Sequence, residues 1–177
     1  MKICYQNLTL RSVEKSDAPL LCGWWNDGKV MAHAGFPFGV GTTVEKVEAR
    51  IAAINDDNQV LIIEVDGKPA GEMSYRRVGD AAEIGIKICD ETQQNKGYGT
   101  KLLQMFITAL FAKGFERIIL DTNYKNTRAQ HVYEKLGFQK VRIRHNAWND
   151  QLGQPQTAVD YELKKADFTP LDVVLDI

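Results

Sequence analysis

The sequence has few cysteines, few histidines and only five prolines. Its 177 residues include three cysteines, none in a Cys-x-x-Cys pair: Cys4, Cys22 and Cys89. Neither a disulfide framework nor a zinc site of the usual spacing is supported by so few, widely separated cysteines. The three histidines also lack metal-ligand spacing, so we expect no metal site.

Charge and hydropathy argue against two further classes of protein. Lys and Arg number 22 and Asp and Glu number 23, a net charge of −1, whereas nucleic-acid binding depends on clustered positive charge. No apolar stretch reaches the roughly 18 residues of a membrane span. The first residues lack the apolar core and cleavage site of a signal peptide. We therefore expect a cytoplasmic protein with reduced cysteines and neither a nucleic acid nor a membrane as partner.

The remaining composition is that of a packed domain, with 44% hydrophobic and 25% charged residues. At about 150 residues per domain, we expect one domain over residues 1–177. Periodicity and turn residues predict strands at 8–13, 60–65, 69–77, 82–88, 117–121, 138–144 and 158–163, and helices at 18–26, 44–54, 97–113 and 127–136. Residues 28–41 are expected to form a loop.

The order of these elements predicts a mixed α/β fold. Asp66-Gly67 and Gly79-Asp80 mark tight turns that join three strands into an antiparallel meander. The later strand-helix-strand order requires a parallel crossover. We expect a single central mixed sheet, mostly antiparallel, flanked by helices. The tail, residues 166–177, is apolar enough to pack but has no predicted place, and residues 171–177 are a candidate interface strand of a homodimer.

The segment Gln94-Asn95-Lys96-Gly97-Tyr98-Gly99-Thr100 lies between a predicted strand and a long predicted helix. Two glycines one residue apart allow a tight turn in which successive N–H groups point into one concavity. Those donors, together with the positive end of the helix dipole, suit a diphosphate. The segment is neither a Walker A loop nor a dinucleotide fingerprint, since Leu102 stands where the third glycine of the fingerprint would be. Alone, it is equally typical of a simple tight turn.

A second motif follows one strand later, Asn126-x-x-Ala129-x-x-x-Tyr133-Glu134-Lys135-x-Gly137-Phe138. Together, QxxGxG and NxxAxxxYEKxGF resemble the GNAT superfamily of N-acetyltransferases, over at least residues 82–141. Residues 8–30 are similar to the branch that contains ribosomal-protein N-terminal, aminoglycoside and polyamine acetyltransferases. One departure is Gln94, which stands where an arginine is also common.

The resemblance implies that acetyl-CoA is the cofactor, with its diphosphate on residues 94–100 and its pantetheine paired with strand 86–88 as an extra strand. It places the Asn126 side chain against the pantetheine amides and the Tyr133 hydroxyl beside the thioester sulfur. The implied cofactor-binding residues are Ile86, Lys87, Ile88, Gln94, Asn95, Lys96, Gly97, Tyr98, Gly99, Thr100, Asn126, Ala129 and Tyr133.

The implied reaction moves an acetyl group from CoA to a primary amine by direct attack in a ternary complex. The amine, with a pKa of about 10, must lose a proton, and the leaving thiolate must gain one. We expect Tyr133 to be the acid, the Ile88 N–H to be the oxyanion donor and Glu83 to be the base, acting through water. Glu72, Asp80 and His33 compete for the role of base. Tyr133 on its helical stripe is otherwise a core aromatic, and Glu83 is otherwise a surface carboxylate.

The acceptor is not fixed by the sequence. Four aromatic residues flank the loop that, by resemblance, covers the acceptor site, although the two tryptophans are equally suited to packing the first helix: Trp24, Trp25, Phe36 and Phe38. A protein N-terminus, an aminoglycoside, a polyamine and a small metabolite all remain open as the amine. Two other functions compete, a non-catalytic acyl-CoA-binding sensor or docking module and a nucleotide-binding domain unrelated to CoA.

Overall fold

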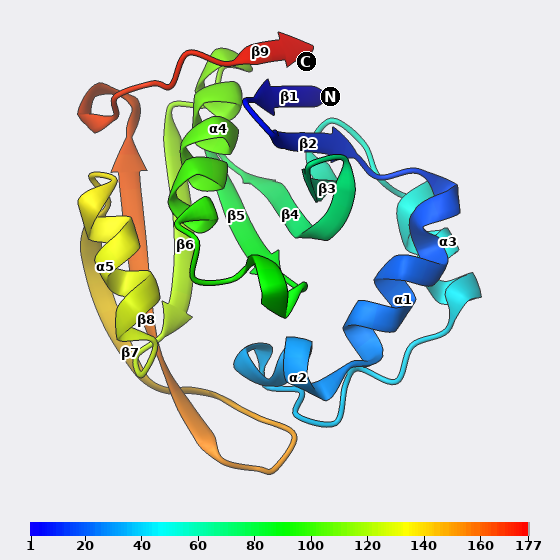
Figure 1. Cartoon of the computed structure of the whole chain (residues 1–177). Coiled ribbons are helices and arrows are strands. Elements are labelled where there is room, and N and C mark those ends of the chain that lie inside the picture. The colour runs from blue at the N-terminus through cyan, green and yellow to red at the C-terminus, as the bar shows by residue number, and fades with distance from the viewer. Residues whose placement is uncertain (177) are drawn as a thin grey trace.

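A nine-stranded sheet organises the chain (Figure 1). The computed structural model describes residues 1–176. The strands lie in the order β7-β8-β6-β5-β4-β3-β2-β1-β9. Their bounds are Lys2–Tyr5 for β1, Leu8–Ser12 for β2, Asn58–Val65 for β3, Lys68–Val78 for β4, Ala81–Ile88 for β5, Arg117–Asn123 for β6, Gln139–Asn149 for β7, Pro155–Lys164 for β8 and Val174–Asp176 for β9. The pair β5 and β6 is parallel and the other neighbouring pairs are antiparallel, which confirms the predicted fold class.

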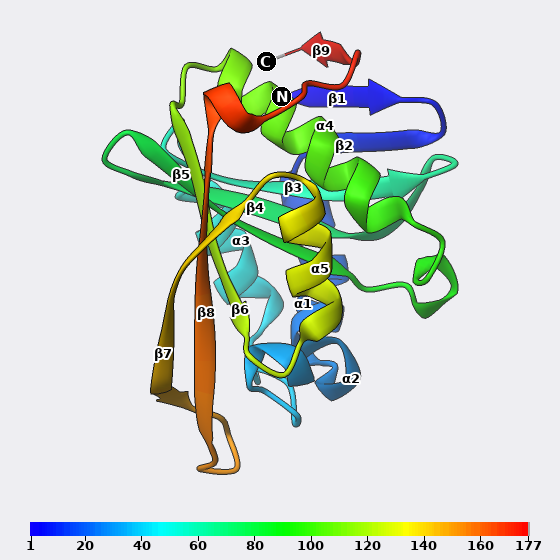
Figure 2. The ribbon, with the colours of Figure 1, turned by 90° about the vertical axis from the view of Figure 1, so that its left-hand side faces the viewer.

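Helices cover both faces of the sheet (Figure 2). On one face lie α4 (Tyr98–Ala112) and α5 (Thr127–Lys135), and on the other lie α1 (Ala18–Asn26) and α3 (Val44–Ala52). Strand β3 contacts both layers because its side chains alternate. Leu61 and Ile63 belong to the core cluster that includes α4, whereas Val60 and Ile62 pack with α1 and α3. A strand buried on both faces has no polar side, which explains the continuous apolar run in the sequence.

The two strand-helix-strand units of the second half are arranged differently. The first, β5-α4-β6, is the predicted parallel crossover between neighbouring strands. In the second, β6-α5-β7, strand β8 lies between β6 and β7 and is antiparallel to both. The last hairpin therefore inserts its second strand into the sheet and leaves β7 at the edge. No helix within residues 1–176 is long and apolar enough to span a membrane.

The structure departs from the predicted elements at both ends of the chain and in the first loop. Strand β1 was not expected, and the tail forms β9, which pairs with β1 of the same chain at Ile3 and Leu175. The tail thus has a place in its own sheet, although Ile177 lies outside the described residues. The expected loop 28–41 contains α2 (Gly28–Met31) and the short 3-10 helix η2 (Ala32–Ala34). Elements of three or four residues are too short to carry a periodic signal.

Candidate active site

The edge of β5 that faces β6 is open over most of its length. Among the described residues, the two strands pair over three positions only, Ala81–Glu83 with Arg117–Ile119. β5 nevertheless runs on to Ile88 and β6 to Asn123. In Figure 2, β6 and β8 stand nearly upright while β4 and β5 run across the view. The divergence leaves a segment of strand edge without a neighbouring strand.

The backbone groups on this open edge can be assigned from the ladder on the other side of β5. Hydrogen-bonding groups of a strand alternate between its two edges. The Cys89 N–H donates to the Ala70 carbonyl of β4 at 2.8 Å, so the N–H groups of Ile86 and Ile88 point the opposite way, toward the opening. The Ile88 carbonyl accepts from Gln94 Nε2 at 3.0 Å. An extended chain of amides would find free donors here, which is the geometry that the expected pantetheine site requires.

The glycine-containing loop joins this open edge to α4. Gly97 is the N-cap residue of α4, with φ +79°, and no side chain caps the helix there. The first N–H groups of a helix have no partner within it, so the N–H groups after Gly97 are available to an anion. In α3 and α5, by contrast, the side chains of Thr43 and Asn126 accept from the first turn. The residues fit the diphosphate that the resemblance implies.

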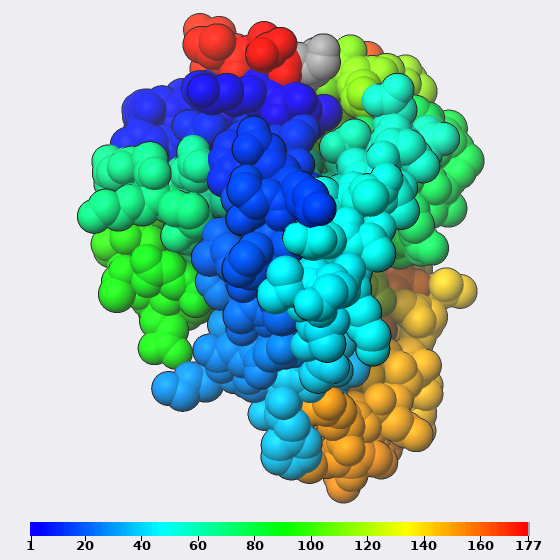
Figure 3. Space-filling view, turned by 90° about the vertical axis from the view of Figure 1, so that its right-hand side faces the viewer, coloured from blue at the N-terminus to red at the C-terminus, as the bar shows by residue number. Residues whose placement is uncertain are grey.

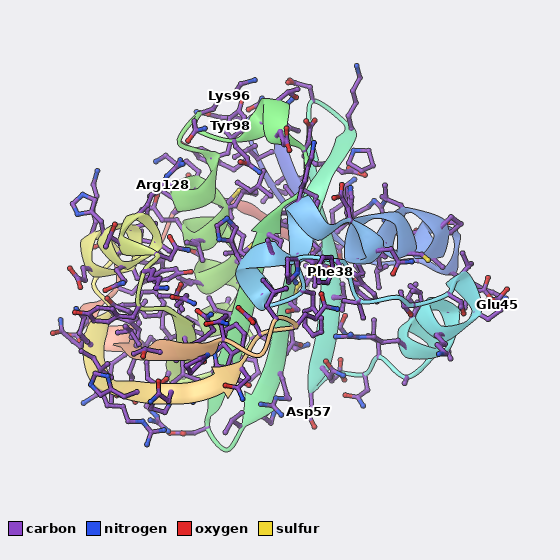
Figure 4. The ribbon with its side chains drawn as sticks, turned by 90° about the horizontal axis from the view of Figure 1, so that it is seen from below. Phe38, Glu45, Asp57, Lys96, Tyr98 and Arg128 are labelled. Atoms are coloured by element: carbon purple, nitrogen blue, oxygen red, sulfur yellow. The ribbon has the colours of Figure 1, made fainter. Side chains whose placement is uncertain are left out.

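The N-terminus of α5 lies beside the same loop. Arg128, in the first turn of α5, donates through Nη1 to Asn95 Oδ1, and Lys96 Nζ donates to Gln93 Oε1 at 3.2 Å. Figure 4 shows Lys96, Tyr98 and Arg128 on one side of the molecule. Arg128 was not among the predicted site residues. The sequence feature that could have indicated it is a cation in the first turn of a helix, where the positive end of the helix dipole disfavours one. Two helix N-termini and two cations therefore meet at one place.

Asn126 and Ala129 form the cap of α5. Asn126 Oδ1 accepts from the Ala129 N–H at 3.1 Å. The oxygen of this side chain is thus engaged in holding the helix, which leaves Nδ2 as the group that can turn outward.

Tyr133 lies on the side of α5 that packs against the sheet. Its ring centroid is 5.7 Å from those of both Phe138 and Tyr161, and the residue is 8% exposed. Burial, followed by the negative charge of Asp121, raises the pKa of the Tyr133 phenol to about 12. The ring packs as a core aromatic, and its hydroxyl remains protonated at neutral pH.

Two of the four candidate bases are held in exposed ion pairs on β5 or its preceding turn. Glu83 Oε2 accepts from Arg76 Nε at 3.0 Å, and 40% of the Glu83 side chain is exposed. Asp80 accepts from Arg117 Nη2 at 2.7 Å. Asp80 precedes β5, at the end opposite the glycine-containing loop, so it lies away from the open edge. Glu83 is the last residue of β5 that still pairs with β6.

The other two candidates lie on the α1 side of the sheet. Both oxygens of Glu72 accept from Trp25 Nε1, at 3.0 and 3.1 Å, and Oε1 accepts from Lys87 Nζ at 2.8 Å. With 6% exposure, Glu72 is a buried and fully bonded carboxylate. His33 lies in η2 and lines a cavity.

This cavity, of about 280 Å³, lies where η2, the end of β6, the start of α5 and the β7-β8 hairpin come together. It is lined by Ala32, His33, Gly35, Asn123, Lys125, Asn126, Trp148, Asp150 and Gln156. Three of the lining side chains form a hydrogen-bonded chain that begins with two amides. Asn123 Nδ2 donates to Gln156 Oε1 at 2.8 Å, and Gln156 Nε2 donates to Asp150 Oδ2 at 2.9 Å. The cavity shares Asn126 with the predicted cofactor site.

The four aromatic residues considered for the acceptor site divide into two pairs. Trp25 belongs to the core between α1 and the sheet, and Trp24 packs against that core, as the packing alternative predicted. Phe36 and Phe38 are 38% and 74% exposed. Trp148, which sequence reasoning missed, is the aromatic that lines the cavity. Its position depends on β7, which runs to Asn149, beyond the strand 138–144 that the sequence predicts.

An open strand edge that leads into a helix N-terminus, with a buried phenol on the next helix, is the arrangement of an acyl-CoA-dependent transferase. The particular family is given by comparison with known proteins. The family model described as "Acetyltransferase (GNAT) domain" matches residues 7–139. The chain belongs to the GNAT acetyltransferase family, and its activity is N-acetyl transfer from acetyl-CoA.

Three similar proteins whose names state an N-acetyltransferase activity support the same family. Ribosomal protein bS18-alanine N-acetyltransferase from Haemophilus ducreyi is 36% identical over 80 residues, which cover 45% of this chain and 55% of that protein. Aminoglycoside N(6′)-acetyltransferase type 1 from Klebsiella pneumoniae is 26% identical over 150 residues, 76% of this chain and 75% of that protein. Among solved structures, spermidine N-acetyltransferase from Vibrio cholerae, in complex with CoA and spermine, has a TM-score of 0.81 at 20% identity and covers 91% of this chain and 97% of that one. The last similarity concerns the fold alone.

Proposed function

We propose that the chain transfers the acetyl group directly to a primary amine while both substrates are bound, without an acetylated enzyme. The observation that carries this proposal is the continuity of the site. The open edge of β5 leads to the uncapped N-terminus of α4, and the cavity adjoins the N-cap residue of α5. Donor and acceptor can therefore approach the same point from two sides.

We assign the diphosphate of CoA to the backbone N–H groups of residues 97–100, with charge supplied by Lys96 and Arg128. The pantetheine lies along Ile86–Ile88 and contacts Asn126. When bound, acetyl-CoA supplies an acyl group activated as a thioester. Gln94, whose amide donates to the Ile88 carbonyl, holds the loop against the end of β5. Gln94 thus orders the phosphate site, and Arg128 supplies charge from the neighbouring helix.

Tyr133 is the proposed acid and the Ile88 N–H is the proposed donor to the acyl oxygen. A phenol with a pKa of about 12 is fully protonated at neutral pH and can give its proton to the leaving sulfur. The Ile88 N–H points to the open edge and can donate as charge develops on the oxygen. Such a donor is typically worth about 3 kcal/mol of transition-state stabilisation.

Glu83 is the proposed base, acting through water, because its carboxylate is partly exposed and stands at the point where β5 and β6 separate. The buried and fully bonded Glu72 instead positions Trp25 and Lys87. His33 is a second candidate, since it lines the cavity that we assign to the acceptor. The two can be distinguished by the loss of kcat in Glu83→Gln and in His33→Gln.

The cavity lining favours an acceptor with uncharged polar groups beside its reactive amine. Asp150 is the one carboxylate among the lining residues, and Lys125 offsets its charge. Asp150 Oδ1 already accepts from the Leu152 and Gln154 N–H groups at 2.9 Å. A polyamine such as the substrate of the spermidine enzyme carries several ammonium groups and would need more carboxylates. A peptide N-terminus or an aminoglycoside, as in the names of the other two relatives, fits the amide chain better.

The experiment is a panel of amines incubated with protein and acetyl-CoA, with free thiol followed over time and product mass measured. The panel contains a peptide with an N-terminal alanine, an aminoglycoside with a free 6′-amine, and spermidine. We expect a product 42 Da heavier from the peptide or the aminoglycoside, and little from spermidine (acetyl minus hydrogen, about 42 Da, is the mass that amide formation adds). Thiol release without an acetylated amine would contradict the proposal.

We also place the reaction in the cytoplasm. The three cysteines of the described chain are free thiols, and a reducing compartment preserves thiols in that state.

A further inference from the structure

Two segments far apart in the sequence meet at the acceptor side. Residues 35–41 belong to the connection from η2 to α3, and residues 150–154 form the turn between β7 and β8. In Figure 3 the hairpin (orange) lies against the light-blue loop at the bottom of the molecule. Gln151 makes all three of the hydrogen bonds that join them. Its backbone N–H donates to the Gly35 carbonyl at 2.9 Å, its Oε1 accepts from the Phe38 N–H at 3.0 Å, and its Nε2 donates to the Gly39 carbonyl at 2.8 Å.

Burial contributes little to holding this part of the loop in place. Phe38 is 74% exposed and Val40 is 42% exposed, and an exposed side chain gains little from the hydrophobic effect. Figure 4 shows Phe38 beside the β7-β8 hairpin in the view from below. The α3 end of the loop is fixed separately, because the Asn26 side chain bonds both the N–H and the carbonyl of Thr42, at 2.8 and 2.9 Å. Within the loop the Gly39 N–H donates to the Phe36 carbonyl at 2.9 Å, and the Val40 N–H donates to the Trp25 carbonyl of α1 at 2.7 Å. The side-chain amide of Gln151 adds the link between residues 38–39 and the hairpin.

The same contact shapes the cavity. His33 and Gly35 line it from the loop side, and Trp148 and Asp150 line it from the hairpin. The Trp148 ring lies directly on Gly35, since a Cβ at Gly35 would be 2.3 Å from Trp148 Cζ3. The loop and the hairpin thus form one wall of the cavity, and Gln151 holds its two parts in register.

We propose that Gln151 is a positioning residue for the amine acceptor. By tying residues 35–39 to the β7-β8 hairpin it fixes the wall against which the amine binds, and it has no part in binding CoA. This inference rests on the proposed function, because it takes the cavity to be the acceptor site.

The test compares Gln151→Ala with Gln154→Ala, a glutamine in the same turn whose side chain makes no hydrogen bond with the described residues. Gln151→Met keeps the length of the side chain without its hydrogen bonds and serves as a second variant. Hydrogen exchange of the Phe38 amide is measured, together with KM for acetyl-CoA and for whichever amine of the panel the wild-type protein acetylates fastest. The loss of two hydrogen bonds predicts at least tenfold faster Phe38 exchange and roughly tenfold higher KM for the amine.

The proposal expects KM for acetyl-CoA to stay within twofold of wild type in every variant, and Gln154→Ala to change nothing. Unchanged Phe38 exchange in both Gln151 variants would overturn it, as would faster exchange with an unchanged KM for the amine. A parallel rise in both KM values would make Gln151 a general structural residue and would also overturn it. The outcomes above overturn the role of Gln151 while the wild-type activity stands. If the wild-type protein acetylates none of the amines, the proposed function itself fails, so the two failures are distinct.

Discussion

The two sides of the proposed active site are built in different ways. The proposed cofactor side, from β5 through α4 and β6 to α5, is one continuous stretch of chain, and the groups assigned to binding are mostly backbone N–H groups at a strand edge and a helix terminus. The proposed acceptor side is assembled from η2, the loop that follows it and the β7-β8 hairpin, joined by the side chain of Gln151.

The difference separates cofactor binding, which is the same for every amine, from recognition of the particular amine. A backbone site tolerates substitution, because its donors do not depend on side-chain identity. A wall held by one amide and by ring packing on Gly35 changes with single residues. We therefore expect variants on the cofactor side to act alike with every amine, and variants on the acceptor side to act on the amine alone.

The largest effect is expected from Tyr133→Phe. Removing the acid should lower kcat by about a thousandfold, within the usual range for general acid catalysis, because the thiolate would leave without a proton. Affinity for CoA, measured by calorimetry, should stay unchanged because the ring is retained. Tyr124→Phe, at an exposed tyrosine just before α5, is the control. A loss that differs greatly between amines would break the proposed separation of the two sides.

A smaller loss, of about a hundredfold in kcat, is expected from Glu83→Gln. The base takes the proton of the amine during the reaction, so the loss should appear in kcat while KM for acetyl-CoA changes little. Asp80→Asn removes a carboxylate that is also paired with an arginine, at the other end of β5, and should leave kcat unchanged. A loss of kcat in His33→Gln with wild-type kcat in Glu83→Gln would move the base to the acceptor side.

Arg128→Gln should weaken CoA binding by about tenfold, the cost of one charge-assisted hydrogen bond. The matched control is Lys135→Gln, which removes the same charge at the far end of α5. Calorimetric titration with CoA and with 3′-dephospho-CoA would identify the phosphate involved. If the variant retains wild-type affinity for both ligands, the loop binds through its backbone without help from α5.

The smallest effect concerns alkaline stability. The pKa of Tyr133 is raised by burial to about 12 from its ordinary value of 10.0, so the unfolded chain releases the phenol proton first as the pH rises. The stability associated with this proton is complete below pH 10 and is lost between pH 10 and 12, about 1 kcal/mol of it by pH 11. Urea unfolding at pH 9 and 11 should show this loss in wild type beyond any loss in Tyr133→Phe. Equal losses would mean that the phenol is exposed to solvent.

The sequence predicted the elements of the proposed cofactor side more fully than those of the proposed acceptor side, for a physical reason. A strand edge, a glycine turn and a helix start are local features, so residues 82–141 carry their own signals. Even there, Arg128 was missed because its partner Asn95 is 33 residues away. On the acceptor side, Trp148 and Gln151 acquire their roles only when the hairpin meets the loop. Trp25, considered for the pocket, is instead buried against Glu72, a contact that no local pattern encodes.

The early divergence of β5 and β6 has a consequence for the fate of the protein in a cell. Strand edges that a ligand completes are satisfied by water in its absence, so the folded state gains stability whenever that ligand is abundant. Resistance to heat and to proteolytic turnover should therefore rise with the concentration of free coenzyme. The steady-state level of the enzyme in a cell should then rise and fall with the supply of coenzyme A.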